Sequence, residues 1–309
     1  MSILNGEHAR PDTLGPLLKP GVGMQAGDVI SAVNGAKVTT LAALDDSLTQ
    51  KAGQQVRIDF TRGAAQMSRI VIPATRGEQM TLLYADWVQH NREAVAAAAG
   101  GKVGYLHLRA MGGADAASFA RDYFEHFDKE GLIIDVRGNR GGNIDSWIIG
   151  TLLRRVWAFW PSPNGSGPAS TNMQQTFRGH LAILIDEGTY SDGETFSAGI
   201  KALDIAPLIG VQTAGAGIWL SDRNPLIDGG QARVAENGQF GLDGRWLVEG
   251  RGVSPNITVE NMPHAAYLGQ DSQLETALGY LRDKIAAEPI PPLTPKAYPP
   301  LGEYGADVR

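Results

Sequence analysis

A serine lies where an apolar run of the sequence gives way to a segment that predicts a helix. Ser191 follows the apolar run 180–186 across a short polar loop, and a helix is predicted over 191–203. A hydroxyl on a tight turn at a helix N-terminus can act as a nucleophile, and the helix end stabilises negative charge beside it. Serine is also a preferred N-cap residue, so this position taken alone also suits a purely structural residue.

A glycine-rich loop, DVRGNRGGN at residues 135–143, follows another apolar run. Glycine lets backbone N–H groups approach a ligand closely, and two converging amides form an oxyanion hole for a tetrahedral intermediate. The candidate donors are the amide of Gly141 or Gly142 and that of Asp192, the residue after the serine. A phosphate-binding loop or a plain turn is the alternative. The sequence matches neither the Gly-Lys-Ser/Thr phosphate loop nor the G-x-G-x-x-G dinucleotide pattern.

A predicted layer of alternating strands and helices places both loops. Nearly continuous apolar runs at 132–136 and 180–186 predict strands that are buried on both faces, and a further strand begins at Lys102. Helices are predicted over 114–127, 146–156 and 191–203. This alternation predicts an α/β layer with a mostly parallel core, in which ligands bind outside the carboxyl ends of the strands. We therefore expect the serine and the glycine-rich loop to share one site.

The region before this layer predicts a small β-rich module over residues 11–75. An apolar segment ends at Asn34-Gly35, a dipeptide typical of a two-residue hairpin turn. Thr39 or Thr40 can cap a short helix that follows this turn. Residues 76–101 then predict a helical connector to the α/β layer.

Four segments occur in order along the chain: GLIIDVRGNRGGN, RGHLAILIDEGTYSDGETFSAGIKAL, PLIGVQTAGAGIW and VEGRGVSPNITVE. Together they resemble the peptidase domain that C-terminal processing (tail-specific) proteases share with tricorn proteases. The stretch Gly21–Gly35 resembles part of the PDZ domain that precedes this domain in both groups. The tricorn branch fits better, because SDGETFS is similar to its nucleophile motif.

The resemblance implies a fold class and a domain order. The fold is α/β (α+β), with a PDZ-like β-rich domain over 11–75 and the helical connector over 76–101. A crotonase-like ββα peptidase domain with a mostly parallel core then occupies 102–285. A proline-rich C-terminal tail is expected over 286–309.

The resemblance also implies roles for single residues. Ser191 would be the nucleophile, and the oxyanion hole would consist of the Asp192 amide with that of Gly141 or Gly142. Arg140 stands where the family often has glycine. A cation at this place could bind a peptide carboxylate or could simply be solvated, and the sequence leaves both readings open.

The base distinguishes the two branches of the family. Processing proteases use a Ser–Lys dyad whose lysine lies in a T-x-G-K-G motif, but this chain reads TAGAG and has Ala216 at that place. A methyl group cannot accept a proton. Tricorn proteases use a histidine instead, within a tetrad that also contains a second serine and a glutamate. That glutamate matches Glu249 in LVEGRGVSPN.

No catalytic histidine can be identified in the sequence. The tricorn histidine belongs to a Ser-His pair on a helical domain before the PDZ domain, and no Ser-His dipeptide occurs here. The chain contains six histidines: His8, His90, His107, His126, His180 and His264. We expect them to be structural. The chain would then lack an N-terminal propeller and helical domain, and alone it would hydrolyse peptides weakly or not at all.

The expected function is therefore that of a serine-type endopeptidase or peptidase that cleaves oligopeptides with a base supplied from elsewhere. One alternative is a catalytically incomplete fragment or pseudopeptidase that only binds peptides. A remote alternative is a crotonase-like acyl-transfer enzyme, against which the PDZ-like segment argues. A serine-reactive phosphonate would separate the first two, because it labels an activated serine.

Composition limits the partners and the compartment. The net charge of −6, with interspersed signs, gives no basic patch for nucleic acid, and the absence of cysteine excludes disulfides and thiol nucleophiles. We expect no metal and no cofactor. No apolar run reaches the roughly 20 residues needed to cross a bilayer, and residues 1–12 do not resemble a signal peptide. The expected partners are a peptide or unfolded protein and further copies of the chain, in the cytoplasm, or in the periplasm if an N-terminal region is missing.

Overall fold

The computed structural model describes residues 13–162 and 167–296. The chain divides into two compact units, and the division falls after Glu93. Each unit is described by itself. The expected domain boundaries after residues 75 and 101 stay predictions.

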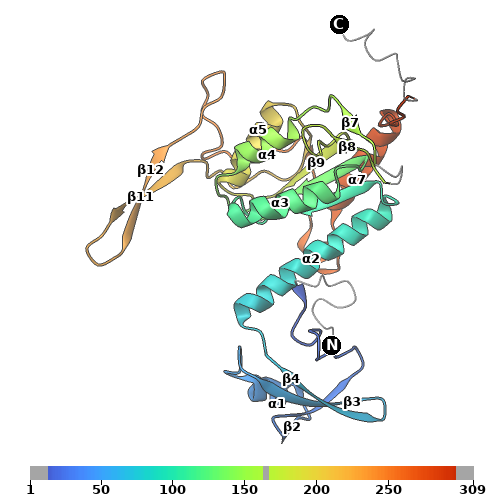
Figure 1. Cartoon of the computed structure of the whole chain (residues 1–309). Coiled ribbons are helices and arrows are strands. Elements are labelled where there is room, and N and C mark those ends of the chain that lie inside the picture. Colours follow the sequence, from blue (N-terminus) through green and yellow to red (C-terminus); the bar gives the residue numbers. More distant parts are fainter. Residues whose placement is uncertain (1–12, 163–166, 297–309) are drawn as a thin grey trace. The chain divides into compact units, whose positions relative to one another are not determined.

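The first unit contains a four-stranded antiparallel sheet with the order β2-β1-β3-β4 (Figure 1). Its strands are β1 (Val29–Val33), β2 (Ala36–Lys37), β3 (Val56–Arg62) and β4 (Ala65–Val71). The predicted hairpin turn joins β1 to β2, and Asn34 and Gly35 both have positive φ, at 50° and 84°. Positive φ at both central residues is the geometry that favours Asn-Gly in such turns.

Helix α1 (Leu41–Leu48) follows the hairpin, and Thr40 caps it by accepting the Ala43 N–H at 3.1 Å. The unit's core consists of buried apolar side chains from the sheet and the preceding loop: Val22, Met24, Val33, Val38, Val56, Ile58, Phe60 and Val71. Helix α2 (Arg76–Ala98) begins in this unit and agrees closely with the predicted helix.

The second unit is built on a five-stranded sheet with the order β13-β10-β9-β6-β5, in which neighbouring strands all pair in parallel. The strands are β5 (Val103–His107), β6 (Gly131–Asp135), β9 (His180–Ile185), β10 (Leu208–Gly210) and β13 (Ile257–Thr258). The predicted α/β class with a mostly parallel core is confirmed. β6 and β9 lie side by side, so the loops that follow them emerge at the same edge of the sheet.

Helices cover the sheet, with α3 (Gly113–Glu125), α4 (Asp145–Leu152) and α5 (Asp192–Ala202) on one face and α7 (Ser272–Ala287) against the strands β6, β9 and β10 (Figure 1). One core joins α3, α4 and α5 to the sheet through fully buried side chains: Leu106, Phe119, Tyr123, Leu132, Ile134, Ile148, Ile183, Phe196 and Ile200. Helix α4 ends at Leu152, four residues before the predicted end.

The sequence analysis did not anticipate several smaller elements. The strands β11 (Trp219–Pro225) and β12 (Gln231–Asn237) form an antiparallel hairpin that stands away from the sheet and its helices (Figure 1). The two-residue strands β7 (Phe159–Trp160) and β8 (Ser170–Thr171) pair with each other, and helix α6 (Pro263–Tyr267) precedes α7. No helix in the described part of the chain has both the length and the apolar character needed to cross a bilayer.

A buried ion-pair network fixes the carboxyl end of β6 to the start of α7. The Asp135 carboxylate is fully buried and accepts hydrogen bonds from the Arg137 guanidinium at 2.7–3.1 Å. Arg137 also donates to Asp271 at 2.8 Å and to Gln273 at 3.1 Å. Burial by itself raises the pKa of Asp135, but the charge of Arg137 and the hydrogen bonds outweigh it and hold this pKa below its usual value. The network anchors the strand from which the glycine-rich loop departs.

Candidate active site

Ser191 occupies the N-cap position of α5 in an unusual backbone conformation. Its φ of 55° and ψ of −118° lie outside the regions that residues with a Cβ normally adopt. Such a conformation costs about 1–3 kcal/mol, and strained strand-to-helix turns hold nucleophilic serines in other hydrolases. The Ser191 side chain makes no capping hydrogen bond and is half-buried. A serine that served only as a cap would use its hydroxyl for the helix.

Gly141 brings the glycine-rich loop directly against this serine. A Cβ atom built on Gly141 would lie 2.5 Å from Ser191 Cβ and 3.0 Å from Ser191 Oγ. Two Cβ atoms do not approach each other this closely in proteins, so only glycine fits at position 141. Its φ of +78° favours glycine as well. Gly142 is equally constrained, since its Cβ would fall 1.9 Å from the Met111 carbonyl oxygen. The predicted meeting of the two loops is present.

The two glycines differ in what their N–H groups do. Gly141 N–H donates to Asn139 Oδ1 at 2.9 Å and is therefore already used. Within residues 13–162 and 167–296, the N–H groups of Gly142 and Asp192 have no acceptor. The Cβ position of Gly141 lies 3.2 Å from Asp192 N and 3.0 Å from Ser191 Oγ, so both atoms lie close to the glycine-rich loop. Gly142 directly follows Gly141 in this loop, and two unclaimed amides that converge on one point can bind an oxyanion.

Asn139 organises both loops, and the sequence analysis missed it. Its side chain is fully buried, and Nδ2 donates to the Leu108 carbonyl oxygen at 2.7 Å while Oδ1 holds Gly141. Its own carbonyl oxygen accepts the Tyr190 N–H at 2.9 Å, one residue before the nucleophile candidate. An asparagine after a glycine in a polar loop is typical of a turn, so the sequence carried no signal that distinguished Asn139.

Glu194 is a second residue that the analysis missed. Its carboxylate is fully buried and accepts the Ser191 N–H at 3.1 Å. It also accepts the Thr213 hydroxyl at 2.6 Å, the Gly215 N–H at 2.6 Å and the Ala216 N–H at 2.8 Å. The turn that carries Ser191 is thus fixed to the TAGAG segment. The signal was present as the Ser-x-x-Glu spacing of a capping box, but that spacing indicates only the contact with Ser191.

Glu249 contacts the residues that continue the TAGAG segment. Its Oε2 atom accepts the Gly217 N–H at 2.8 Å and the Ile218 N–H at 2.9 Å, and its side chain is exposed. Gly217 follows Ala216, so Glu249 and Glu194 hold successive amides of one loop. Glu249 is therefore joined to the nucleophile turn through this loop, and its exposed carboxylate can accept a further hydrogen bond.

The described residues include five histidines: His90, His107, His126, His180 and His264. The buried His107 ring has Nε2 2.9 Å from the Arg137 carbonyl oxygen, and burial lowers its pKa. His180 Nε2 lies 2.7 Å from the Glu288 carbonyl oxygen, and His126 forms the C-terminal cap of α3. No histidine of residues 13–162 or 167–296 is hydrogen-bonded to Ser191. His8 lies outside the described residues.

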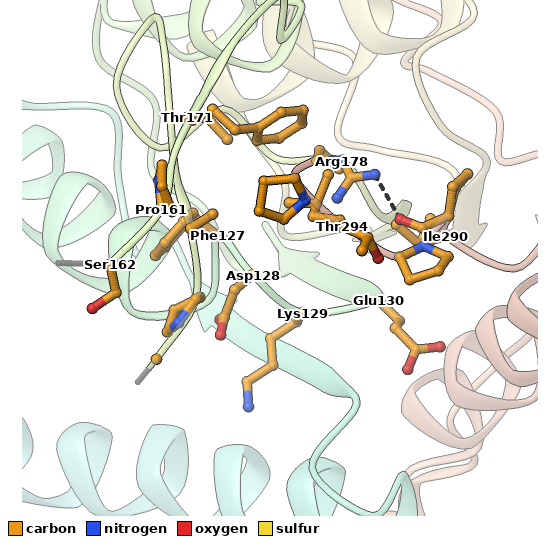
Figure 2. A pocket seen from close by; sticks show the side chains of 18 residues that line it. Phe127, Asp128, Lys129, Glu130, Pro161, Ser162, Thr171, Arg178, Ile290 and Thr294 are labelled. Atoms are coloured by element: carbon orange, nitrogen blue, oxygen red, sulfur yellow. Dashed lines mark hydrogen bonds between the residues drawn. The ribbon is translucent and has the colours of Figure 1, made fainter. Parts of the chain in front are cut away.

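A cavity of about 630 Å³ lies elsewhere on the second unit and is not this site (Figure 2). Phe127, Glu130, Arg178 and Ile290 are among its lining residues, and Arg178 donates to the Pro291 carbonyl oxygen at 2.9 Å. Glu130 immediately precedes β6, so the cavity lies toward the amino ends of the strands, whereas Ser191 follows the carboxyl end of β9. In the described segments, no cluster of three or more His, Asp or Glu side chains could hold a metal ion.

Comparisons with known proteins show which family the chain resembles. Residues 1–76 match the tricorn protease PDZ domain, and residues 102–259 match peptidase family S41. Tricorn protease homolog 1 of Streptomyces coelicolor is 34% identical over 96% of this chain, and the tricorn protease of Thermoplasma acidophilum is 28% identical over 91%. The chain spans only 28% and 26% of those proteins.

A crystal structure of the tricorn protease superposes with a TM-score of 0.83 at 27% identity, over 91% of this chain and 27% of that one. The matched family region includes Ser191, Glu194 and Glu249, so the sequence likeness and the site geometry concern the same residues. The chain belongs to peptidase family S41, as a serine peptidase of the tricorn type.

Proposed function

We propose that this chain carries the nucleophile and the oxyanion hole of an enzyme that hydrolyses peptide bonds in oligopeptides. Ser191 is the nucleophile, and the amides of Gly142 and Asp192 bind the oxyanion. The observation that carries the proposal is the Ser191 turn, strained at a φ of 55° with two unclaimed amides next to it. Gly141 serves as the close-packing residue of the hole rather than as a donor, because Asn139 takes its N–H.

The reaction follows from these positions. The Ser191 oxygen attacks the carbonyl carbon of the scissile bond, and its proton passes to a base. The former carbonyl oxygen becomes negative and is bound by the amides of Gly142 and Asp192. The C–N bond then breaks, the leaving amine takes the proton, and water hydrolyses the serine ester by the same route. No metal or cofactor is required for any of these steps.

The base is proposed to come from outside the described residues, as a histidine on another segment or chain. Ala216 supports this, because it stands where a lysine base would lie in processing proteases. Glu249 supports it as well, since its carboxylate is anchored by two amides and remains exposed toward an incoming group. Its proposed role is to orient that base, in the way a buried carboxylate orients the histidine of a serine triad.

The biological setting is part of the proposal and is supported by likeness alone. The substrates are oligopeptides or unfolded chains, the active form is a homo-oligomer, and the compartment is the cytoplasm. The PDZ-like match over residues 1–76 is consistent with a peptide partner.

The second candidate function is peptide binding without turnover, which the absence of a histidine at Ser191 among the described residues favours. A fluorophosphonate probe separates the two, because it forms a covalent bond only with an activated serine. The full chain is incubated with the probe alone and after addition of the histidine-bearing region of a tricorn relative, with Ser191→Ala as the control. Labelling of Ser191 that rises at least a hundredfold on addition supports the peptidase. Equal, negligible labelling in both samples supports the binding protein.

A further inference from the structure

We propose that the side chain of Asp192 is a positioning residue, which fixes the two oxyanion amides relative to each other and does so in a pH-dependent way because Asp145 lies beside it. This inference rests on the proposed function, in which Asp192 contributes only its backbone N–H. The side chain of Asp192 would then hold the second proposed donor, the Gly142 amide, in place.

The contacts of the Asp192 carboxylate cross from one helix to another. Oδ2 accepts the Ile144 N–H at 2.8 Å and the Asp145 N–H at 3.2 Å, at the beginning of α4. These amides follow the proposed donor Gly142 by two and three residues. The carboxylate therefore ties the segment that contains Gly142 to the first residue of α5. A small rotation of either helix would separate the two donors, and this tie opposes it.

The second oxygen of the same carboxyl has no conventional partner. Asp192 is only 2% exposed, and its Oδ1 atom is buried without a hydrogen-bond acceptor or donor assigned to it among the described residues. Buried oxygens of this kind are rare, because each costs the free energy of its lost hydration. The other charged residues of these elements are Asp145 on α4, Arg137 and Arg140 in the loop before α4, and Glu194 and Lys201 on α5. Arg137 pairs with Asp135 and Asp271, Glu194 accepts the Thr213 hydroxyl and three amides, Lys201 donates to the Ser254 carbonyl oxygen, and Arg140 is exposed.

Burial and the neighbouring Asp145 carboxyl together raise the pKa of Asp192 to about 7. Burial contributes most, followed by the repulsion from the Asp145 carboxylate. Below this pH, the Asp192 carboxyl holds a proton. The folded chain keeps this proton after the unfolded chain has released it, so the free energy of unfolding falls as the pH rises from about 4 toward 7.

Ionisation has the opposite effect on the tie itself. An ionised oxygen accepts N–H groups more strongly than a protonated carboxyl does. As the proton leaves, the hydrogen bonds to the amides of Ile144 and Asp145 strengthen, and the Gly142 segment is held more firmly. As the pH rises through neutrality, the free energy of unfolding therefore falls while the proposed oxyanion hole becomes better ordered.

The test records the amide signals of Ile144 and Asp145 by NMR on the full chain between pH 5 and 9, which needs no catalytic activity. In the wild type, both amide protons shift downfield with one midpoint near 7. Asp192→Asn keeps an oxygen acceptor but abolishes this titration, and Asp145→Asn moves the midpoint down by at least one pH unit. Asp283→Asn, which removes an exposed carboxyl on α7, leaves it unchanged. An unaltered midpoint in Asp192→Asn or in Asp145→Asn overturns the proposal.

A second measurement connects the tie to chemistry. With the histidine-bearing region of a tricorn relative added, Asp192→Ala is expected to lower the rate of fluorophosphonate labelling at Ser191 at least tenfold, and Asp192→Asn to retain most of it. Equal losses in both variants would mean that charge rather than position matters and would overturn the positioning role. Absence of labelling in the wild type with that region added, while the NMR titration is intact, would instead contradict the proposed function and leave the contact between Asp192 and the start of α4 in place.

Discussion

The Cβ position of Gly141 lies 2.5 Å from the Cβ atom of Ser191, so the glycine-rich loop and the nucleophile turn are in contact through a residue that has no side chain. This approach places the unclaimed amide of Asp192 within 3.2 Å of the same point. The proposed oxyanion hole therefore depends on a steric condition as well as on its donors.

Gly141→Ala should disrupt that contact. The added methyl group would overlap Ser191 Cβ, so either the Ser191 turn or the glycine-rich loop has to shift. Both are held by hydrogen bonds, so this shift is costly. We expect the rate of fluorophosphonate labelling at Ser191 to fall at least tenfold. Gly138→Ala is the matched control, since Gly138 also has positive φ, at +62°, but open space around its Cβ position. Equal losses in the two variants would show that backbone strain, and not the contact, is responsible.

Glu194→Gln should loosen the nucleophile turn. One carboxylate oxygen accepts the N–H groups of Ser191 and Ala216, and the other accepts the Thr213 hydroxyl and the Gly215 N–H. A glutamine would replace one of these two acceptor oxygens with an NH2 group, which would then face groups that are themselves donors. A cost of about 2–4 kcal/mol is expected, because buried groups are left unsatisfied. Chemical denaturation measures it.

Glu187→Gln, in the exposed part of the same loop, is the control for Glu194→Gln and should change the free energy of unfolding by less than about 0.5 kcal/mol. Labelling of Ser191 should also fall in Glu194→Gln alone. A fully stable and fully reactive Glu194→Gln chain would contradict the role assigned to this carboxylate.

The strands and helices around the site were predictable because their signals are local. The apolar run before Ser191 and the polar loop after it placed β9 and α5 to within about one residue, and the Asn34-Gly35 turn was likewise visible. The proximity of Ser191 and Gly141 could be predicted as well, because neighbouring parallel strands bring the loops at their carboxyl ends to the same edge of the sheet. The family resemblance then added Glu249, which local patterns do not distinguish from a surface carboxylate.

The rest depended on contacts between distant segments. The proposed choice of Gly142 over Gly141 depends on the side chain of Asn139, which is held by the Leu108 carbonyl oxygen just after β5. Glu194 was not singled out, because its contact with Thr213 bridges 19 residues and leaves no local signal. The hairpin β11–β12 was missed because its strands carry polar residues on both faces and β12 is exposed throughout, so no period-two pattern marks it.

Ala216→Lys should supply a base within the chain. The backbone nitrogens of Ser191 and Ala216 bind the same oxygen of Glu194, at 3.1 Å and 2.8 Å, so they lie within about 6 Å of each other. A lysine side chain can span this distance, and a desolvated amine is an effective base. We expect labelling of Ser191 to rise at least tenfold, with a pH midpoint below that of a free lysine.

Ala214→Lys is the control for this gain, because residue 214 is exposed in the same segment but is not held by Glu194. A rise of equal size in both variants would show a general effect of positive charge. No rise in either would indicate that position 216 does not face the serine hydroxyl.

The buried pair of Asp135 and Arg137 should make the stability of the second unit depend on acid. The pKa of Asp135 is lowered in the fold, so its contribution is complete above its unfolded value of about 4 and is lost as the pH falls below it. Arg137→Met leaves a fully buried carboxylate without its partner, and we expect a cost of about 3–5 kcal/mol at pH 7. The cost should shrink toward pH 3, where Asp135 becomes protonated in the variant. Denaturant unfolding at several pH values measures this trend against Asp283→Asn, and a cost that stays constant with pH would mean that Arg137 acts only through packing.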